Sequence, residues 1–102
     1  LRRAGLQRAE ERIDNGYRLF PDCRKYIGKL PSEYARRLYY DTCIFFGPAP
    51  LMARDFVGND RLMFGTDFPY IDQTSSYIDT LPIPEADKTA ILGGNAERLF
   101  KL

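Results

Sequence analysis

The stretch RLMFGTDFP, residues 61–69, decides the fold of this chain. It opens with a short, nearly continuous apolar run, which is typical of a strand covered on both faces, as in a parallel sheet. Asp67 stands where that strand would end, and parallel α/β folds build their sites at the carboxyl ends of strands. From spacing alone a structural role fits equally well, in which Asp67 caps the following turn beside Thr66 and Pro69.

The residues before this stretch predict a strand, helix and strand in series. Residues 38–46, LYYDTCIFF, are dense in strand formers. Residues 50–57, PLMARDFV, begin with a proline suited to a first helical turn and end before Gly58-Asn59. Together with residues 61–66 they form the βαβ pattern of about thirty residues, so we expect two adjacent parallel strands.

The flanking segments predict helices. Residues 1–13 place Leu6, Ala9 and Ile13 at helical spacing among charges, and Asn15-Gly16 should end that helix. The other expected helical segments are a short start at Pro21-Asp22, 31–37, 77–81, 84–92 ended by Gly93-Gly94, and a last helix capped by Asn95.

The composition limits the chemistry. The chain has 102 residues, enough for one domain at most, and contains no histidine. Imidazole is the commonest base near neutral pH and a common zinc ligand, so a complete site from this chain alone would need other groups. Cys23 and Cys43 lack zinc-finger spacing, and we expect buried or partly buried thiols in a reducing cytoplasm. No apolar run approaches the roughly 20 residues of a membrane span, so no membrane partner is expected.

Three blocks carry a resemblance to a known family. They are LYYDTCIFFGPAPL (38–51), VGNDRLMFGTDFPY (57–70) and DKTAILGGNAERLF (87–100). The combination of G-T-D-x-P with a downstream G-N-A-x-R-L resembles the amidohydrolase-2 family, in its aminocarboxymuconate-semialdehyde decarboxylase-like branch. Residues 11–23 weakly resemble the segment after the sixth strand of those decarboxylases.

The resemblance implies an α/β fold, the C-terminal portion of a TIM (β/α)8 barrel. Residues 1–102 would be a single partial domain, with a helical segment at 1–37 and the seventh and eighth βα units and C-terminal helices at 38–102. Asp67 matches the family's last-strand aspartate, which ligates a divalent metal, usually zinc and sometimes manganese, and handles a proton in catalysis. The family's histidine ligands have no counterpart here. We therefore expect a fragment that is inactive and metal-free alone.

The resemblance also implies a function for the parent enzyme. It would be a metal-dependent decarboxylase or hydrolase acting on a small carboxylated aromatic or related ring compound, as a homo-oligomer. Arg12 aligns with an arginine that holds the substrate carboxylate, although a solvated helix arginine is the favoured interpretation. Phe68, like Tyr70, either walls the substrate pocket or is a core aromatic. Asp41 either lines the barrel or has a hydrogen-bonded structural role.

Two alternatives from other classes stay open. One is a catalytically dead remnant that acts as an interaction protein. The other is a small basic nucleic-acid-binding module, because residues 1–40 carry ten Lys and Arg against five Asp and Glu. That charge is scattered and partly offset by acidic neighbours, so no nucleic-acid partner is expected.

Overall fold

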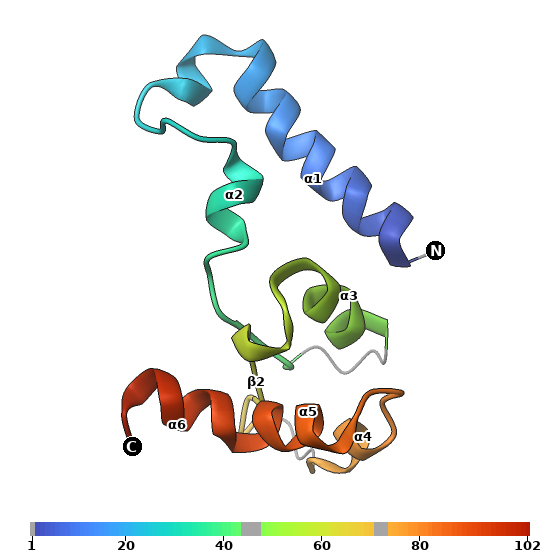
Figure 1. Ribbon diagram of the computed structural model, residues 1–102. Coiled ribbons are helices and arrows are strands. Elements are labelled where there is room, and N and C mark those ends of the chain that lie inside the picture. Colours follow the sequence, from blue (N-terminus) through green and yellow to red (C-terminus); the bar gives the residue numbers. More distant parts are fainter. Residues whose placement is uncertain (1, 44–47, 71–73) are drawn as a thin grey trace. The chain divides into compact units, whose positions relative to one another are not determined.

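The computed structural model describes residues 2–43, 48–70 and 74–102 (Figure 1). The chain divides into two compact units, with the boundary after Leu38. Within the described ranges no helix is both long and apolar enough to cross a membrane.

The first unit contains three helical elements: α1 (Arg2–Leu19), η1 (Pro21–Arg24) and α2 (Pro31–Ala35). The predicted stop of the first helix at Asn15-Gly16 is wrong, because α1 runs on to Leu19 and the Phe20 amide still donates to the Gly16 carbonyl at 3.0 Å. The stop comes from Pro21, which disfavours helical backbone in the residue before it. Phe20 is accordingly extended, with φ −120° and ψ 109°.

Polar groups join α1 to α2. The buried Asp14 carboxylate accepts hydrogen bonds from the Ser32 amide at 2.9 Å and the Ser32 hydroxyl at 2.6 Å. Because Ser32 lies in the first turn of α2, Asp14 satisfies one of the amides that a helix start leaves unpaired. Arg36 forms an ion pair with Glu10. The sequence predicts a mostly exposed amphipathic helix over residues 1–13, and the 45% exposure of Ile13 agrees with this.

The second unit begins with a parallel βαβ arrangement, as predicted. Its elements are β1 (Tyr40–Asp41), α3 (Pro48–Val57), η2 (Asn59–Arg61) and β2 (Leu62–Met63). The strands pair in parallel. Both are shorter than the runs 38–46 and 61–66, although residues 44–47 of the first run lie outside the described residues.

The C-terminal helices follow one another without a break and form one continuous helical segment, which Figure 1 shows from α5 to α6. After α4 (Ser76–Asp79) come α5 (Glu85–Thr89), the π-helical turn η3 (Ala90–Gly94) and α6 (Asn95–Phe100). The predicted helix end at Gly93-Gly94 is therefore wrong. So is the capping role of Asn95, because its buried side chain instead donates to the carbonyls of Asn59 at 2.7 Å and Leu62 at 2.8 Å.

The core of this unit forms where β2 meets α4, the residues that follow α4, and the C-terminal helices. The buried apolar residues are Leu62, Ile78, Leu81 and Ile91. A terminal portion of a barrel is expected to leave four side chains on the barrel-facing side of its strands uncovered, namely Tyr39, Ile44, Leu62 and Phe64. For Leu62 this is wrong, since it is only 1% exposed. Ile44 lies outside the described residues.

An ion pair connects α3 to the C-terminal helical segment. Arg54 donates to the Asp87 carboxylate at 2.6 Å and to the Asn59 side chain at 3.0 Å. The Asn59 side chain in turn donates to the Asp87 carbonyl at 3.2 Å. The carboxyl end of β2 thus belongs to a unit whose helices are cross-linked through η2.

Candidate active site

The candidate site lies where the two parallel strands end. Asp41 is the last residue of β1, and Gly65, Thr66 and Asp67 follow β2. The two ends approach closely, because a Cβ added at Gly65 would lie 3.2 Å from the Asp41 Cβ. Glycine at position 65 is what allows Asp41 to occupy that space. The Asp41 carboxylate accepts a hydrogen bond from the Cys43 amide at 2.9 Å. Of the two roles predicted for Asp41, this is the hydrogen-bonded structural one.

Asp67 is exposed and has left-handed backbone, with φ 59°. Asp is among the few non-glycine residues that tolerate this conformation. Its main-chain carbonyl accepts a bond from the Tyr70 amide at 3.0 Å, while the side-chain acceptor in the turn is the Thr66 hydroxyl, bonded by the Phe68 amide at 3.2 Å. Among the described residues, none donates to the Asp67 carboxylate. The carboxylate is therefore not engaged as the turn cap.

The pKa of the Cys43 thiol depends on the two aspartates at the strand ends. Burial raises the pKa of its thiol, and the negative charges of Asp67 and Asp41 raise it further. The Cys43 thiol therefore lies within electrostatic reach of both carboxylates and stays protonated at neutral pH. Cys23 is exposed, so the expectation of two at least partly buried thiols is wrong for Cys23.

Two residues that the sequence did not single out, Thr42 and Tyr77, form hydrogen bonds at the strand ends beneath the site. Thr42 is 1% exposed, and its hydroxyl accepts a bond from the Gly65 amide at 3.3 Å. The Tyr77 hydroxyl donates to the Thr42 carbonyl at 2.7 Å and also contacts the Thr42 hydroxyl. Burial raises the pKa of Tyr77, with Cys43 and Asp41 adding to the effect and the Thr42 hydrogen bond opposing it. The phenol thus stays protonated at neutral pH.

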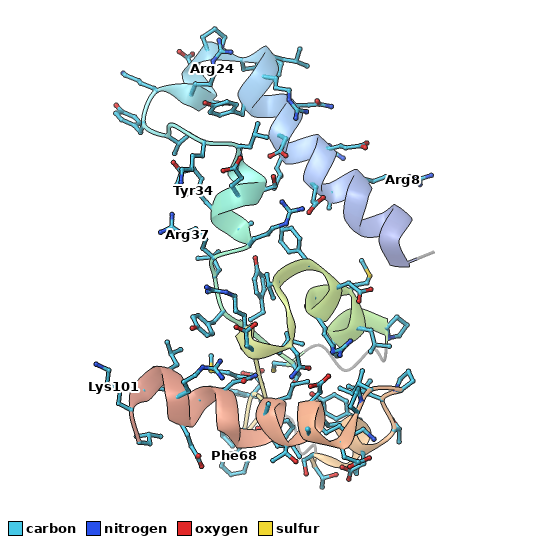
Figure 2. All side chains as sticks on the ribbon, in the orientation of Figure 1. Arg8, Arg24, Tyr34, Arg37, Phe68 and Lys101 are labelled. Atoms are coloured by element: carbon cyan, nitrogen blue, oxygen red, sulfur yellow. The ribbon has the colours of Figure 1, made fainter. Side chains whose placement is uncertain are left out.

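The other predicted site residues are on the surface of their units. Phe68, labelled in Figure 2, is 80% exposed, and Tyr70 is 86% exposed, so neither is a core aromatic here. Arg12 is an exposed residue of α1. It belongs to the first unit, whereas Asp67 and Phe68 belong to the second.

The described residues fit one position of a metal site and not the whole of it. Across 2–43, 48–70 and 74–102, no group of three His, Cys, Asp or Glu side chains could hold a metal ion. The chain has no histidine. A catalytic zinc site typically takes three protein ligands. The exposed Asp67 carboxylate can supply one.

Comparison with known proteins places the chain in a family. The family profile described as Amidohydrolase matches residues 4–102. The chain belongs to the amidohydrolase family. This agrees with the resemblance carried by its two motifs.

Three similar proteins show what the amidohydrolase relatives do. A 2-keto-4-carboxy-3-hexenedioate hydratase from a Sphingobium species is 29% identical over 83 residues, 70% of this chain and 24% of the hydratase. The structure of 5-carboxyvanillate decarboxylase from Sphingomonas paucimobilis matches with a TM-score of 0.76 and 29% identity, over 91% of this chain and 30% of the decarboxylase. A dihydroxybenzoic acid decarboxylase from a Polaromonas species, solved with manganese and the inhibitor 2-nitroresorcinol, matches with a TM-score of 0.71 and 30% identity, over 96% of this chain and 31% of that enzyme.

The chain therefore spans about a quarter to a third of the length of these relatives. The two decarboxylases act on carboxylated aromatics, by their names.

Proposed function

We propose that residues 38–102 form the seventh and eighth βα units and C-terminal helices of a barrel enzyme that decarboxylates carboxylated aromatics, and that Asp67 is its last-strand metal ligand. The observation that carries the proposal is the Asp67 carboxylate itself. It follows the second of two parallel strands, is exposed, and receives no hydrogen bond from the described residues. A carboxylate in that position is available to an incoming cation.

The manganese in the Polaromonas relative supports a divalent metal, and favours manganese over zinc. Carboxylate oxygen is a ligand type that suits manganese. A bound divalent metal would polarise an oxygen of the substrate or activate a water. The remaining ligands would come from parts of the barrel that these 102 residues do not contain, so the chain alone would be inactive.

Two further residues have proposed roles at the substrate. Phe68 follows Asp67 directly and is 80% exposed, so its ring is available to pack on an aromatic substrate. Arg12 has an exposed guanidinium, which suits a carboxylate fork. The unpaired thiols of Cys23 and Cys43 fit a cytoplasmic protein.

A hydratase is the second candidate function. The Sphingobium hydratase matches 70% of the chain, and its substrate is named as a carboxylate too. Both candidates would use Asp67 as a metal ligand. A decarboxylase breaks a carbon–carbon bond and releases carbon dioxide, whereas a hydratase adds water across a double bond. Assays of carbon dioxide release and of water addition would separate them.

The test is a chimera in which this chain replaces the matching part of the Polaromonas decarboxylase. We expect the chimera to bind manganese and to release carbon dioxide from a carboxylated aromatic. Asp67→Asn should lower both metal content and rate by about 100-fold or more, since a metal ligand is lost. The matched control is Asp55→Asn, an exposed carboxylate on α3, which should change neither.

Two outcomes would contradict the proposal. One is an Asp67→Asn chimera that keeps its manganese and its rate. The other is a folded, manganese-loaded chimera that releases no carbon dioxide from any carboxylated aromatic, which would leave the hydratase as the better candidate.

A further inference from the structure

We infer that Thr42 and Tyr77 are positioning residues that end the parallel ladder between β1 and β2 and thereby fix the backbone that presents Asp67. The inference rests on the proposed function only for what Asp67 does there. The arrangement of the two residues stands on their own contacts.

The first contacts show where the ladder changes. The Thr42 amide donates to the Met63 carbonyl at 3.0 Å, as the register of Asp41 opposite Met63 requires. In a regular parallel ladder the next bond would run from the Gly65 amide to the Thr42 carbonyl. Here the Gly65 amide instead donates to the Thr42 hydroxyl at 3.3 Å.

Tyr77 lies at the acceptor of the regular bond. Its hydroxyl donates to the Thr42 carbonyl at 2.7 Å and so competes for the oxygen that the Gly65 amide would use in the regular ladder. The Tyr77 ring packs beside Phe64, with centroids 6.2 Å apart, which holds the phenol at that place. Thr42 and Tyr77 therefore turn a main-chain bond into a side-chain bond at the point where β2 ends.

The consequence reaches Asp67 through two residues. The Gly65 amide is bonded to the Thr42 side chain. In the turn that follows, the Phe68 amide donates to the Thr66 hydroxyl and the Tyr70 amide donates to the Asp67 carbonyl. The backbone at Asp67 has left-handed φ within this turn. The place of its carboxylate thus depends on the side-chain anchor at Thr42.

Amide exchange and hydrogen-bond couplings, measured by NMR on the full chain without metal or substrate, test the inference. Thr42→Val keeps the shape but removes the acceptor, and should speed exchange of the Gly65 amide by about fivefold. Thr42→Ser keeps the hydroxyl and should restore the slow rate. Tyr77→Phe keeps the ring but frees the Thr42 carbonyl, and a through-bond coupling from the Gly65 nitrogen to the Thr42 carbonyl carbon should then appear. Tyr70→Phe is the matched control, because its 86% exposed ring adjoins the same turn.

The results that would overturn the inference are specific to Gly65. Equal exchange in Thr42→Val and the unmodified chain would do so, and so would exchange in Thr42→Ser as fast as in Thr42→Val. An unprotected Gly65 amide in the unmodified chain would also contradict it. If Thr42→Val loses protection throughout, the coupling in Tyr77→Phe against Tyr70→Phe decides. Asp67→Asn should leave Gly65 exchange unchanged, so failure of the metal proposal is seen separately.

Discussion

The side-chain amide of Asn95 donates to the main-chain carbonyl of Leu62 at 2.8 Å, and so the start of α6 covers the edge of β2 that faces away from β1. On the same edge the Phe64 amide donates to the Ile91 carbonyl at 2.9 Å. Ile91 lies in the π-helical turn η3. An open strand edge invites pairing with other chains, and here helical residues satisfy its polar groups at both Leu62 and Phe64.

Asn95→Ala should destabilise the second unit by about 2–3 kcal/mol, because it leaves the carbonyls of Asn59 and Leu62 without their donor. Urea unfolding followed by circular dichroism would measure it. The matched control is Asn15→Ala, an exposed asparagine of α1, which should change stability by less than about 0.5 kcal/mol. Equal midpoints for Asn95→Ala and the unmodified chain would show that the buried amide contributes nothing.

This relationship marks how far the sequence could predict the fold. The apolar run before Gly65 and the proline at the start of residues 50–57 are local signals, and they placed the parallel βαβ unit correctly. Gly93-Gly94 and Asn95 also give a local signal, for a helix end and a new cap, and it is misleading. The Leu62 carbonyl that Asn95 serves is 33 residues away in the chain, which no local pattern records.

Gly65→Ala should destabilise the chain by about 1–3 kcal/mol, because its Cβ would lie 3.2 Å from the Asp41 Cβ in a packed strand end. Gly93→Ala is the control, since a Cβ there meets nothing within 4 Å. Adding Asp41→Gly to Gly65→Ala should recover part of the loss, and a double-mutant cycle would measure the coupling. Strictly additive effects would mean that the two residues do not compete for space.

The candidate site shows the same division between local and distant signals. Asp67 could be predicted because it directly follows an apolar strand in the sequence, so the signal lies in neighbouring residues. Thr42 offered only its place in the strand, and Tyr77, 35 residues further on, offered only its place at the start of the expected helical segment 77–81. Contacts that depend on how a loop returns to a strand end require the fold itself.

Asp67 should be a position where stability and function conflict. With φ 59°, glycine fits the backbone best and alanine worst, so Asp67→Gly should be about 1 kcal/mol more stable than Asp67→Ala, with the unmodified chain between them. Both substitutions remove the carboxylate and should remove manganese from the chimera alike. Thermal or urea unfolding of the three chains checks the order. A chain with Asp67→Ala as stable as that with Asp67→Gly would argue against a left-handed backbone at this residue.

Asp14 should make the first unit sensitive to acid. Burial raises the pKa of Asp14, but the hydrogen bonds from Ser32 and the charges of Arg18 and Arg36 outweigh it, so the pKa lies below its ordinary value of 3.8. A carboxyl whose pKa is lower folded than unfolded stabilises the fold at pH values above the unfolded pKa. That contribution is lost as the pH falls through the folded pKa, since protonation then costs the unit its charged acceptor.

Urea midpoints of the α1–α2 unit, read from the Ser32 amide resonance at pH values from about 6 down to about 2.5, should therefore fall more steeply for the unmodified chain than for Asp14→Asn. Other carboxyl groups titrate in the same range, and the difference between the two chains removes their share. Asp22→Asn, an exposed neighbour in η1, should keep the slope of the unmodified chain. Parallel midpoint curves for the unmodified chain and Asp14→Asn would show that the Asp14 carboxylate does not hold α2 to α1.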